Sequence, residues 1–222
     1  MTATSAETYR ARRLAMVNSQ LRTGDVVDRE VLAAFLETPR ERFVAPSFAE
    51  LAYLDRDAPA LGAKRRRLLP PLTLARLLQA AAVSAGDKAL DVGGGSGYGA
   101  EILARMGAKV VALESDPGAA EAARTALSGR GNVTVVVGPL DTGAKELAPF
   151  DLIVVQGAFR VSPDALLALL ADGGRMVGVD ATMGASQAAL YDRQGDGISR
   201  RALFETTAQT LDGFESRVSF AF

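Results

Sequence analysis

The sequence predicts an α/β fold in which helices cover both faces of a mostly parallel β-sheet. Five apolar runs rich in Val, Ile and Leu lie between residues 88 and 180, and helix-type segments separate them. The runs are unbroken rather than alternating, which is typical of parallel strands buried on both faces. A glycine cluster directly follows the first run, at the place where doubly wound sheets bind ligands.

The first 60 residues are predicted to be helical. Apolar residues before Pro39 follow helix spacing, with Asp28 as the N-cap and Pro39 just past the end of the helix. A further helix is predicted over residues 72–83. We therefore divide the chain into an N-terminal helical section, residues 1–67, and a sheet-containing domain, residues 68–222, which together form one compact unit.

The sheet-containing domain is predicted to alternate strands with helices. The apolar runs predict strands over residues 88–92, 109–114, 133–137, 151–155 and 175–180. The segments between them predict helices over residues 97–106, 117–127 and 163–170. Pro117 suits the first position of the second of these helices. Two later runs, 188–191 and 216–222, are joined through the glycines around residue 196, which predicts an antiparallel pair that closes the sheet.

The chain contains no Cys, no His and no Trp. This composition excludes disulfides, Cys or His metal sites, Cys nucleophiles and Ser-His-Asp hydrolysis. The formal net charge of −1 gives no general argument for nucleic-acid binding. No apolar run is long enough to span a membrane, and the first residues lack a signal-peptide pattern, so a cytoplasmic location is expected. No metal is expected.

The glycine loop over residues 91–99 carries the main functional signal. One frame, Gly95, Gly97 and Ala100, fits a dinucleotide fingerprint, but it starts three residues past the strand end. The better frame begins with an acid at the end of the strand, Asp91, followed by glycines at alternate positions. A carboxylate there would repel a pyrophosphate and would suit a ligand with an ammonium group, as in S-adenosylmethionine.

Glu114 ends the second predicted strand. A carboxylate at that position can accept hydrogen bonds from both hydroxyls of a ribose, which fits either candidate ligand. The alternative is that Asp91 and Glu114 are ordinary strand-end carboxylates in water. The glycine loop alone is weak evidence, but the loop combined with an acid on each of two adjacent strands favours a nucleoside site.

At this point the sequence resembles the Rossmann-type S-adenosylmethionine methyltransferases, and among them the protein-L-isoaspartate O-methyltransferase family. The resemblance covers roughly residues 16 to 180. The family-like stretches, as they stand here, are Met16-Val17-x-x-Gln20-Leu21, Asp28-x-x-Val31-Leu32, Pro39-Arg40-x-x-Phe43-Val44, Ala52-Tyr53-x-Asp55, Gly86-Asp87-Lys88-Ala89-Leu90-Asp91, Ala148-Pro149-Phe150-Asp151 and Gly173-Gly174-Arg175. The N-terminal stretches are the more specific ones.

The resemblance implies a Rossmann-like, seven-stranded sheet and an N-terminal section that helps to form the substrate site. It implies methyl transfer to a carboxylate of a protein or peptide, which is ionised at neutral pH and needs no general base. Catalysis then depends on holding the reacting atoms in line. The expected cofactor-binding residues are Asp91, Gly93, Gly94, Gly95, Ser96, Gly97, Glu114, Ser115, Leu140 and Gln156. No residue is assigned as a catalytic acid or base.

The chain departs from the family in its substrate segment. Where the family has Thr-Ile-Ser-Gln-Pro, this chain has Arg66-Arg67-Leu68-Leu69-Pro70, so the hydroxyls are gone. The basic run that ends at Arg67 either holds an anionic acceptor or is a solvated loop. Arg66, Arg67 and Leu68 are the candidate substrate residues. Leu140 lies where the family has a Gly-Asp-Gly loop.

Two functions of different classes follow from these features. The first is an S-adenosylmethionine-dependent methyltransferase that acts on an isoaspartyl or another carboxylate. The second is a non-catalytic scaffold or sensor that kept the cofactor pocket, which the lost hydroxyls around Leu68 favour. A third hypothesis is an oxidoreductase that binds a dinucleotide.

Overall fold

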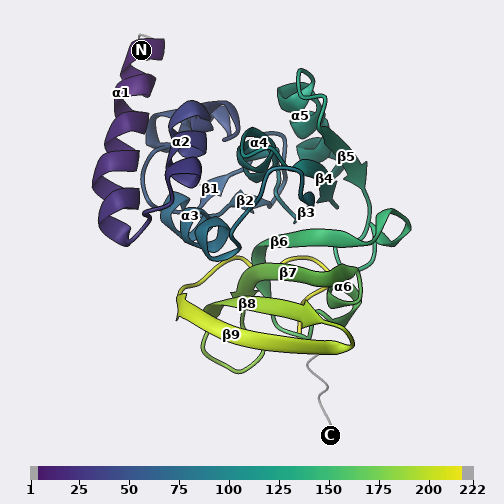
Figure 1. Cartoon of the computed structure of the whole chain (residues 1–222). Coiled ribbons are helices and arrows are strands. Elements are labelled where there is room, and N and C mark those ends of the chain that lie inside the picture. Colours follow the sequence, from purple (N-terminus) through teal and green to yellow (C-terminus); the bar gives the residue numbers. More distant parts are fainter. Residues whose placement is uncertain (1–4, 217–222) are drawn as a thin grey trace, which may run out of the picture.

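The computed structural model describes residues 5–216. Its main sheet has seven strands in the order β5-β4-β3-β6-β7-β8-β9 (Figure 1). In chain order the strands are β3 (Lys88–Val92), β4 (Lys109–Glu114), β5 (Val133–Val137), β6 (Phe150–Phe159), β7 (Leu170–Asp180), β8 (Gln187–Gln194) and β9 (Gly197–Glu205). The first five are parallel to one another, and β8 and β9 are antiparallel. The predicted seven-stranded, mostly parallel sheet is confirmed.

Some helices pack on the sheet, and others form the N-terminal section beside it. They are α1 (Ala6–Met16), α2 (Arg29–Glu37), α3 (Pro71–Ala80), α4 (Tyr98–Arg105), α5 (Pro117–Leu127) and α6 (Asp164–Leu167). A short antiparallel pair, β1 (Ala58–Pro59) and β2 (Arg67–Leu68), precedes α3. Asp28 caps α2 as predicted, because its Oδ1 accepts from the N–H groups of Glu30 and Val31 at 2.8 and 3.2 Å.

Several predicted boundaries are wrong at the far side of the sheet. The helix predicted over 163–170 is only the four residues of α6, because Leu170 already pairs with Phe150 and begins β7. Among the described residues the last strand is β9, which forms a hairpin with β8 through the predicted turn around residue 196. The strand predicted over 216–222 lies outside the described residues, except for Ser216, which is irregular.

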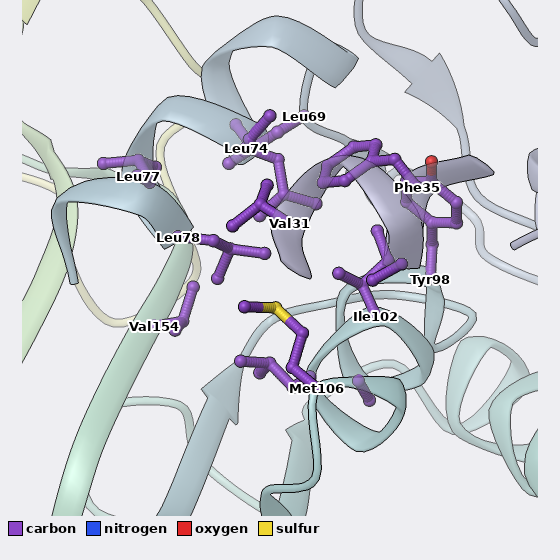
Figure 2. Packing of buried hydrophobic residues seen from close by; sticks show 14 of the residues in the cluster. Val31, Phe35, Leu69, Leu74, Leu77, Leu78, Tyr98, Ile102, Met106 and Val154 are labelled. Atoms are coloured by element: carbon purple, nitrogen blue, oxygen red, sulfur yellow. The ribbon is translucent and has the colours of Figure 1, made fainter. Parts of the chain in front are cut away.

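Two apolar cores lie on opposite faces of the sheet, because alternate residues of each strand face opposite sides. Ala89 of β3 belongs to the first core, and Leu90 and Val92 belong to the second. The first core joins the N-terminal section to α3, α4 and α5. Figure 2 shows where α2, α3 and α4 meet in it, with the labelled side chains Val31, Phe35, Leu74, Leu77, Leu78, Tyr98 and Ile102.

The second core is covered by less regular structure than the first. The expected helix there is replaced by short α6, a 3₁₀ turn over Lys145–Leu147 and the segment that follows β9. We call residues 206–216 the C-terminal segment. Its backbone adds to β6, since the N–H of Ala158 donates to the carbonyl of Gln209 at 2.8 Å. No helix within residues 5–216 is long and apolar enough to cross a membrane.

Candidate functional site

The candidate site lies at the carboxyl ends of β3, β4 and β6. The chain runs outward from β3 to β4 and β5 on one side, and β6 lies on the other side of β3. The loop after β3 is therefore at the switch point of the sheet, where ligands of open α/β sheets bind. Asp91 and Glu114 lie at the ends of β3 and β4, and Gln156 follows Val155, the last residue of β6 that pairs with β3. All three face the side of the sheet that carries α4 and α5.

The glycine loop approaches its neighbours so closely that side chains would not fit. Gly95 has a φ of +65°, and a Cβ on it would lie 2.8 Å from the Cβ of Ala60. Its N–H donates to Glu114 Oε2 at 2.8 Å. Gly97 has a φ of +93° and precedes α4, where it packs against Leu127 of α5. The loop therefore joins the sheet to α5 and to the pair of short strands β1 and β2.

Asp91 is completely buried beneath the first turn of α4. Its Oδ1 accepts a hydrogen bond from Gln156 Nε2 at 2.7 Å, and Gly99 leaves room for that amide, since a Cβ there would lie 1.6 Å from Nε2. Asp91 Oδ2 has no hydrogen-bond partner among the described residues. Burial raises the pKa of Asp91 to about 7; the hydrogen bond from Gln156 opposes this rise and the charge of Glu114 adds to it.

This raised pKa predicts a stability that depends on pH. A carboxyl whose pKa is higher in the folded than in the unfolded state destabilises the fold as pH rises from its ordinary pKa to the folded one. Asp91→Asn is therefore expected to raise the free energy of unfolding of the ligand-free protein. The gain should grow between about pH 4 and pH 7 and level off at roughly 4 kcal/mol above that. Urea denaturation at pH 5 and pH 8 measures it.

A matched control is Asp196→Asn in the exposed turn between β8 and β9. This variant should change the unfolding free energy little, and equally at both pH values. If Asp91→Asn gave the same difference from the parent protein at pH 5 and pH 8, Asp91 would not carry the raised pKa.

Glu114 is enclosed and all its acceptor positions are used. Its Oε1 accepts from the N–H groups of Ser115 and Asp116 at 2.8 and 3.0 Å, and its Oε2 accepts from Gly95. The guanidinium of Arg66 spans both oxygens, with Nε 3.3 Å from each and Nη2 3.2 Å from Oε1. Both side chains of this ion pair are 3% exposed.

The side chains of Ser96, Ser115 and Leu140, which were also expected to bind the cofactor, contact other parts of the protein in this structure. Ser96 is fully buried, and its hydroxyl donates to the carbonyl of Phe43, which joins the loop to the N-terminal section. Ser115 accepts from Arg66 Nη2 at 3.1 Å. Leu140 is buried beneath Gly93.

The three candidate substrate residues separate onto two sides of the site. Arg66 lies on the Glu114 side, whereas Arg67 and Leu68 line a pocket of about 270 Å³ that Gln156 also lines. Arg67 forms an ion pair with Asp57. The sequence analysis grouped all three as substrate residues. The structure separates Arg66, which ends the β1–β2 connection, from Arg67 and Leu68, which form β2.

A larger pocket of about 720 Å³ lies on the Glu114 side. Its lining carries both signs of charge: Lys64, Arg65 and Arg66 are basic, and Asp116, Asp212 and Glu215 are acidic. Gln209 of the C-terminal segment lines both pockets. Both pockets therefore lie between the β1–β2 pair and this segment, and we call the space that holds them the crevice.

Sequence reasoning missed the contribution of the C-terminal segment. Leu211 is buried over the glycine loop, and a Cβ on Gly93 would lie 3.0 Å from its Cδ1. Asp212 Oδ2 is 3.1 Å from Arg66 Nη2 and accepts from Ser115 Oγ at 3.0 Å. No local pattern marks this segment, which reaches the site only because β8 and β9 return the chain across the sheet.

Comparisons with known proteins give a consistent picture. A family model described as Protein-L-isoaspartate(D-aspartate) O-methyltransferase (PCMT) matches residues 11–208. Protein-L-isoaspartate O-methyltransferase of Aeropyrum pernix is 40% identical over 178 residues, which cover 78% of this chain and 68% of that protein. The enzyme of the same name from Methylorubrum populi is 40% identical over 168 residues, 75% of this chain and 78% of that protein.

Solved structures agree with this similarity. A protein-L-isoaspartate O-methyltransferase structure superposes with a TM-score of 0.80 at 25% identity, covering 90% of this chain and 66% of that one. A Plasmodium falciparum structure assigned the same activity, in complex with S-adenosyl-L-homocysteine, gives 0.75 at 21% identity, covering 90% and 97%. The second likeness supports the fold alone.

Proposed function

This chain belongs to the protein-L-isoaspartate(D-aspartate) O-methyltransferase family, and on that premise we propose that it methylates a carboxylate held on the Gln156 side of its crevice. As a member of the family it is an S-adenosylmethionine-dependent methyltransferase, which favours the enzyme over the non-catalytic scaffold considered above. The acceptor and the residues that hold the two substrates are the parts that we propose.

The observation that carries the proposal is the placement of Asp91 and Glu114. These two acids lie on neighbouring strands with a close-packed glycine loop between them. The unpartnered Oδ2 of Asp91 fits the positive methionine end of the cofactor, directly or through water. Once Arg66 has moved away, Glu114 has one acceptor position left for a ribose hydroxyl, because three backbone N–H groups hold the others. Gly93, Gly94 and Gly95 would contact the cofactor between these ends.

The acceptor chemistry agrees with the composition of the chain. S-adenosylmethionine, when bound, supplies an electrophilic methyl group. A carboxylate is already ionised at neutral pH, so its oxygen needs no general base before it attacks. The chain has no His to act as one. What the protein has to do is orient the acceptor and exclude water, and positioning of this kind supplies up to about 7–11 kcal/mol in the best cases.

The pocket of about 270 Å³ beside Gln156 is the proposed acceptor site. Arg56 and Arg67 line it, and guanidinium groups bind carboxylates through paired hydrogen bonds. Arg67 lies between Arg66 and Leu68, the two positions where the family pattern has neutral hydroxyls, and Arg56 adds a second positive charge from outside that segment. An acidic peptide or protein acceptor, isoaspartyl or other, is therefore the substrate class that this site favours.

The proposal is tested with methyl-labelled S-adenosylmethionine and two peptides that differ only in an isoaspartyl or an aspartyl residue. We expect label to enter at least one of them, in a form that mild base releases as volatile methanol, as a carboxyl methyl ester does. Label that base does not release would place the methyl group on another atom. No transfer to these peptides or to a mixture of acidic proteins would reject methylation of a carboxylate.

A further inference from the structure

Arg66 occupies the position at Glu114 that the proposed ribose site requires. Its guanidinium lies against both oxygens of Glu114, and its stem crosses the glycine loop, where a Cβ on Gly95 would lie 3.2 Å from Arg66 Cγ. With three backbone N–H groups also bound, Glu114 has no free acceptor position, since a carboxylate offers about four. A ribose hydroxyl can bind Glu114 only after Arg66 leaves.

The same arginine joins the two segments that cover the crevice. Arg66 comes from the end of the β1–β2 connection, and its Nη2 also contacts Asp212 of the C-terminal segment at 3.1 Å. Next to Asp212, Leu211 packs on Gly93 and also on Gly157, where a Cβ would lie 2.5 Å from Leu211 Cδ2. We call Arg66, Glu114 and Asp212 the latch.

The latch can open without disturbing the core. The Asp212 side chain is 71% exposed, and Arg66 lines the pocket of about 720 Å³ on that side. Arg66 can therefore rotate into solvent beside Asp116 and Glu215, which also line this pocket and carry the opposite charge. Glu114 keeps its three backbone hydrogen bonds when Arg66 departs, so the carboxylate remains oriented.

We propose that Arg66 is an intrachain competitor for Glu114 and sets the affinity of this chain for its cofactor. This inference rests on the proposed function, because it assumes that the cofactor binds at the crevice. For a ligand that needs the open form, the apparent dissociation constant equals the intrinsic constant divided by the fraction of molecules in which the latch is open. A mostly closed latch therefore weakens binding. Removing the guanidinium abolishes that competition.

Isothermal titration with S-adenosyl-L-homocysteine tests the proposal on the full chain. Arg66→Met keeps an unbranched stem over Gly95 and removes the charge, and it is expected to lower the dissociation constant by about tenfold or more. Arg65→Met is the matched control, because Arg65 is the exposed neighbour, and it should leave the constant unchanged. Equal or weaker binding by Arg66→Met, with binding by the parent protein, would show that Arg66 does not compete.

Two further outcomes separate this inference from the proposed function. If neither the parent protein nor folded Arg66→Met binds at millimolar ligand, both the competition and the cofactor site are rejected. If Arg66→Met does not fold, Asp212→Asn replaces it, since this exposed change weakens only the outer contact of the latch. That variant should bind about threefold more tightly, and an unchanged dissociation constant would overturn the latch.

Discussion

Glu114→Ala is expected to lower the free energy of unfolding by about 3 kcal/mol. The change leaves the Arg66 guanidinium enclosed without its main partner, and it removes the acceptor for three backbone N–H groups. Breaking a buried ion pair by removing one partner typically costs 3–5 kcal/mol. We expect the lower end of that range, because Asp212 still contacts Arg66. Urea denaturation measures the difference.

A double-mutant cycle shows whether the cost comes from the pair. In the Arg66→Met background, Glu114→Ala should cost clearly less, because no enclosed charge is left behind. Glu121→Ala on α5 is the matched control: this exposed glutamate pairs with Arg124 at 3.3 Å, and its loss should cost less than about 1 kcal/mol. A Glu114→Ala protein as stable as the control would contradict the enclosed pair.

Arg40→Ala is expected to destabilise the protein by about 4 kcal/mol. Arg40 is completely buried, donates to the carbonyls of Ala52 and Leu69 at 2.9 and 2.8 Å, and lies 4.6 Å from the centre of the Tyr98 ring. Its removal leaves two buried carbonyls without these donors and a cavity between the N-terminal section and α4. Burial lowers the pKa of Arg40, although the guanidinium remains the form that makes these bonds.

Arg42→Ala provides the control in the same short turn, because Arg42 is exposed. Its unfolding free energy should stay within about 0.5 kcal/mol of the parent value. Thermal or urea denaturation followed by circular dichroism compares the two variants. A loss for Arg40→Ala as small as that for Arg42→Ala would mean that Arg40 does not hold the N-terminal section to α4.

The strands nearest the site were predictable from the sequence. The runs over 88–92, 109–114 and 133–137 match β3, β4 and β5 at both ends, because Gly, Pro and Asp residues bound these short units. The strands β6 and β7 are longer than their apolar runs. Pairing between distant residues decides their ends, as when Phe150 pairs with Leu170, and a local pattern does not contain that information.

The acids of the site were predictable as a pair, but their neighbours were not. Asp91 and Glu114 lie at the carboxyl ends of strands that the alternation of elements makes adjacent. The partner of Glu114, however, is 48 residues away in the chain. Arg66 was assigned to the substrate side because it replaces a family hydroxyl. The structure instead places it against Glu114, with its Nε 3.3 Å from both carboxylate oxygens.

The most direct test of the whole account is a crystal structure of the full chain with S-adenosyl-L-homocysteine. It should show a ribose hydroxyl within hydrogen-bond distance of Glu114, the amino acid end of the ligand on the Asp91 side of the glycine loop, and Arg66 turned into the neighbouring pocket. A ligand bound elsewhere, or one bound while Arg66 still spans both oxygens of Glu114, would contradict it.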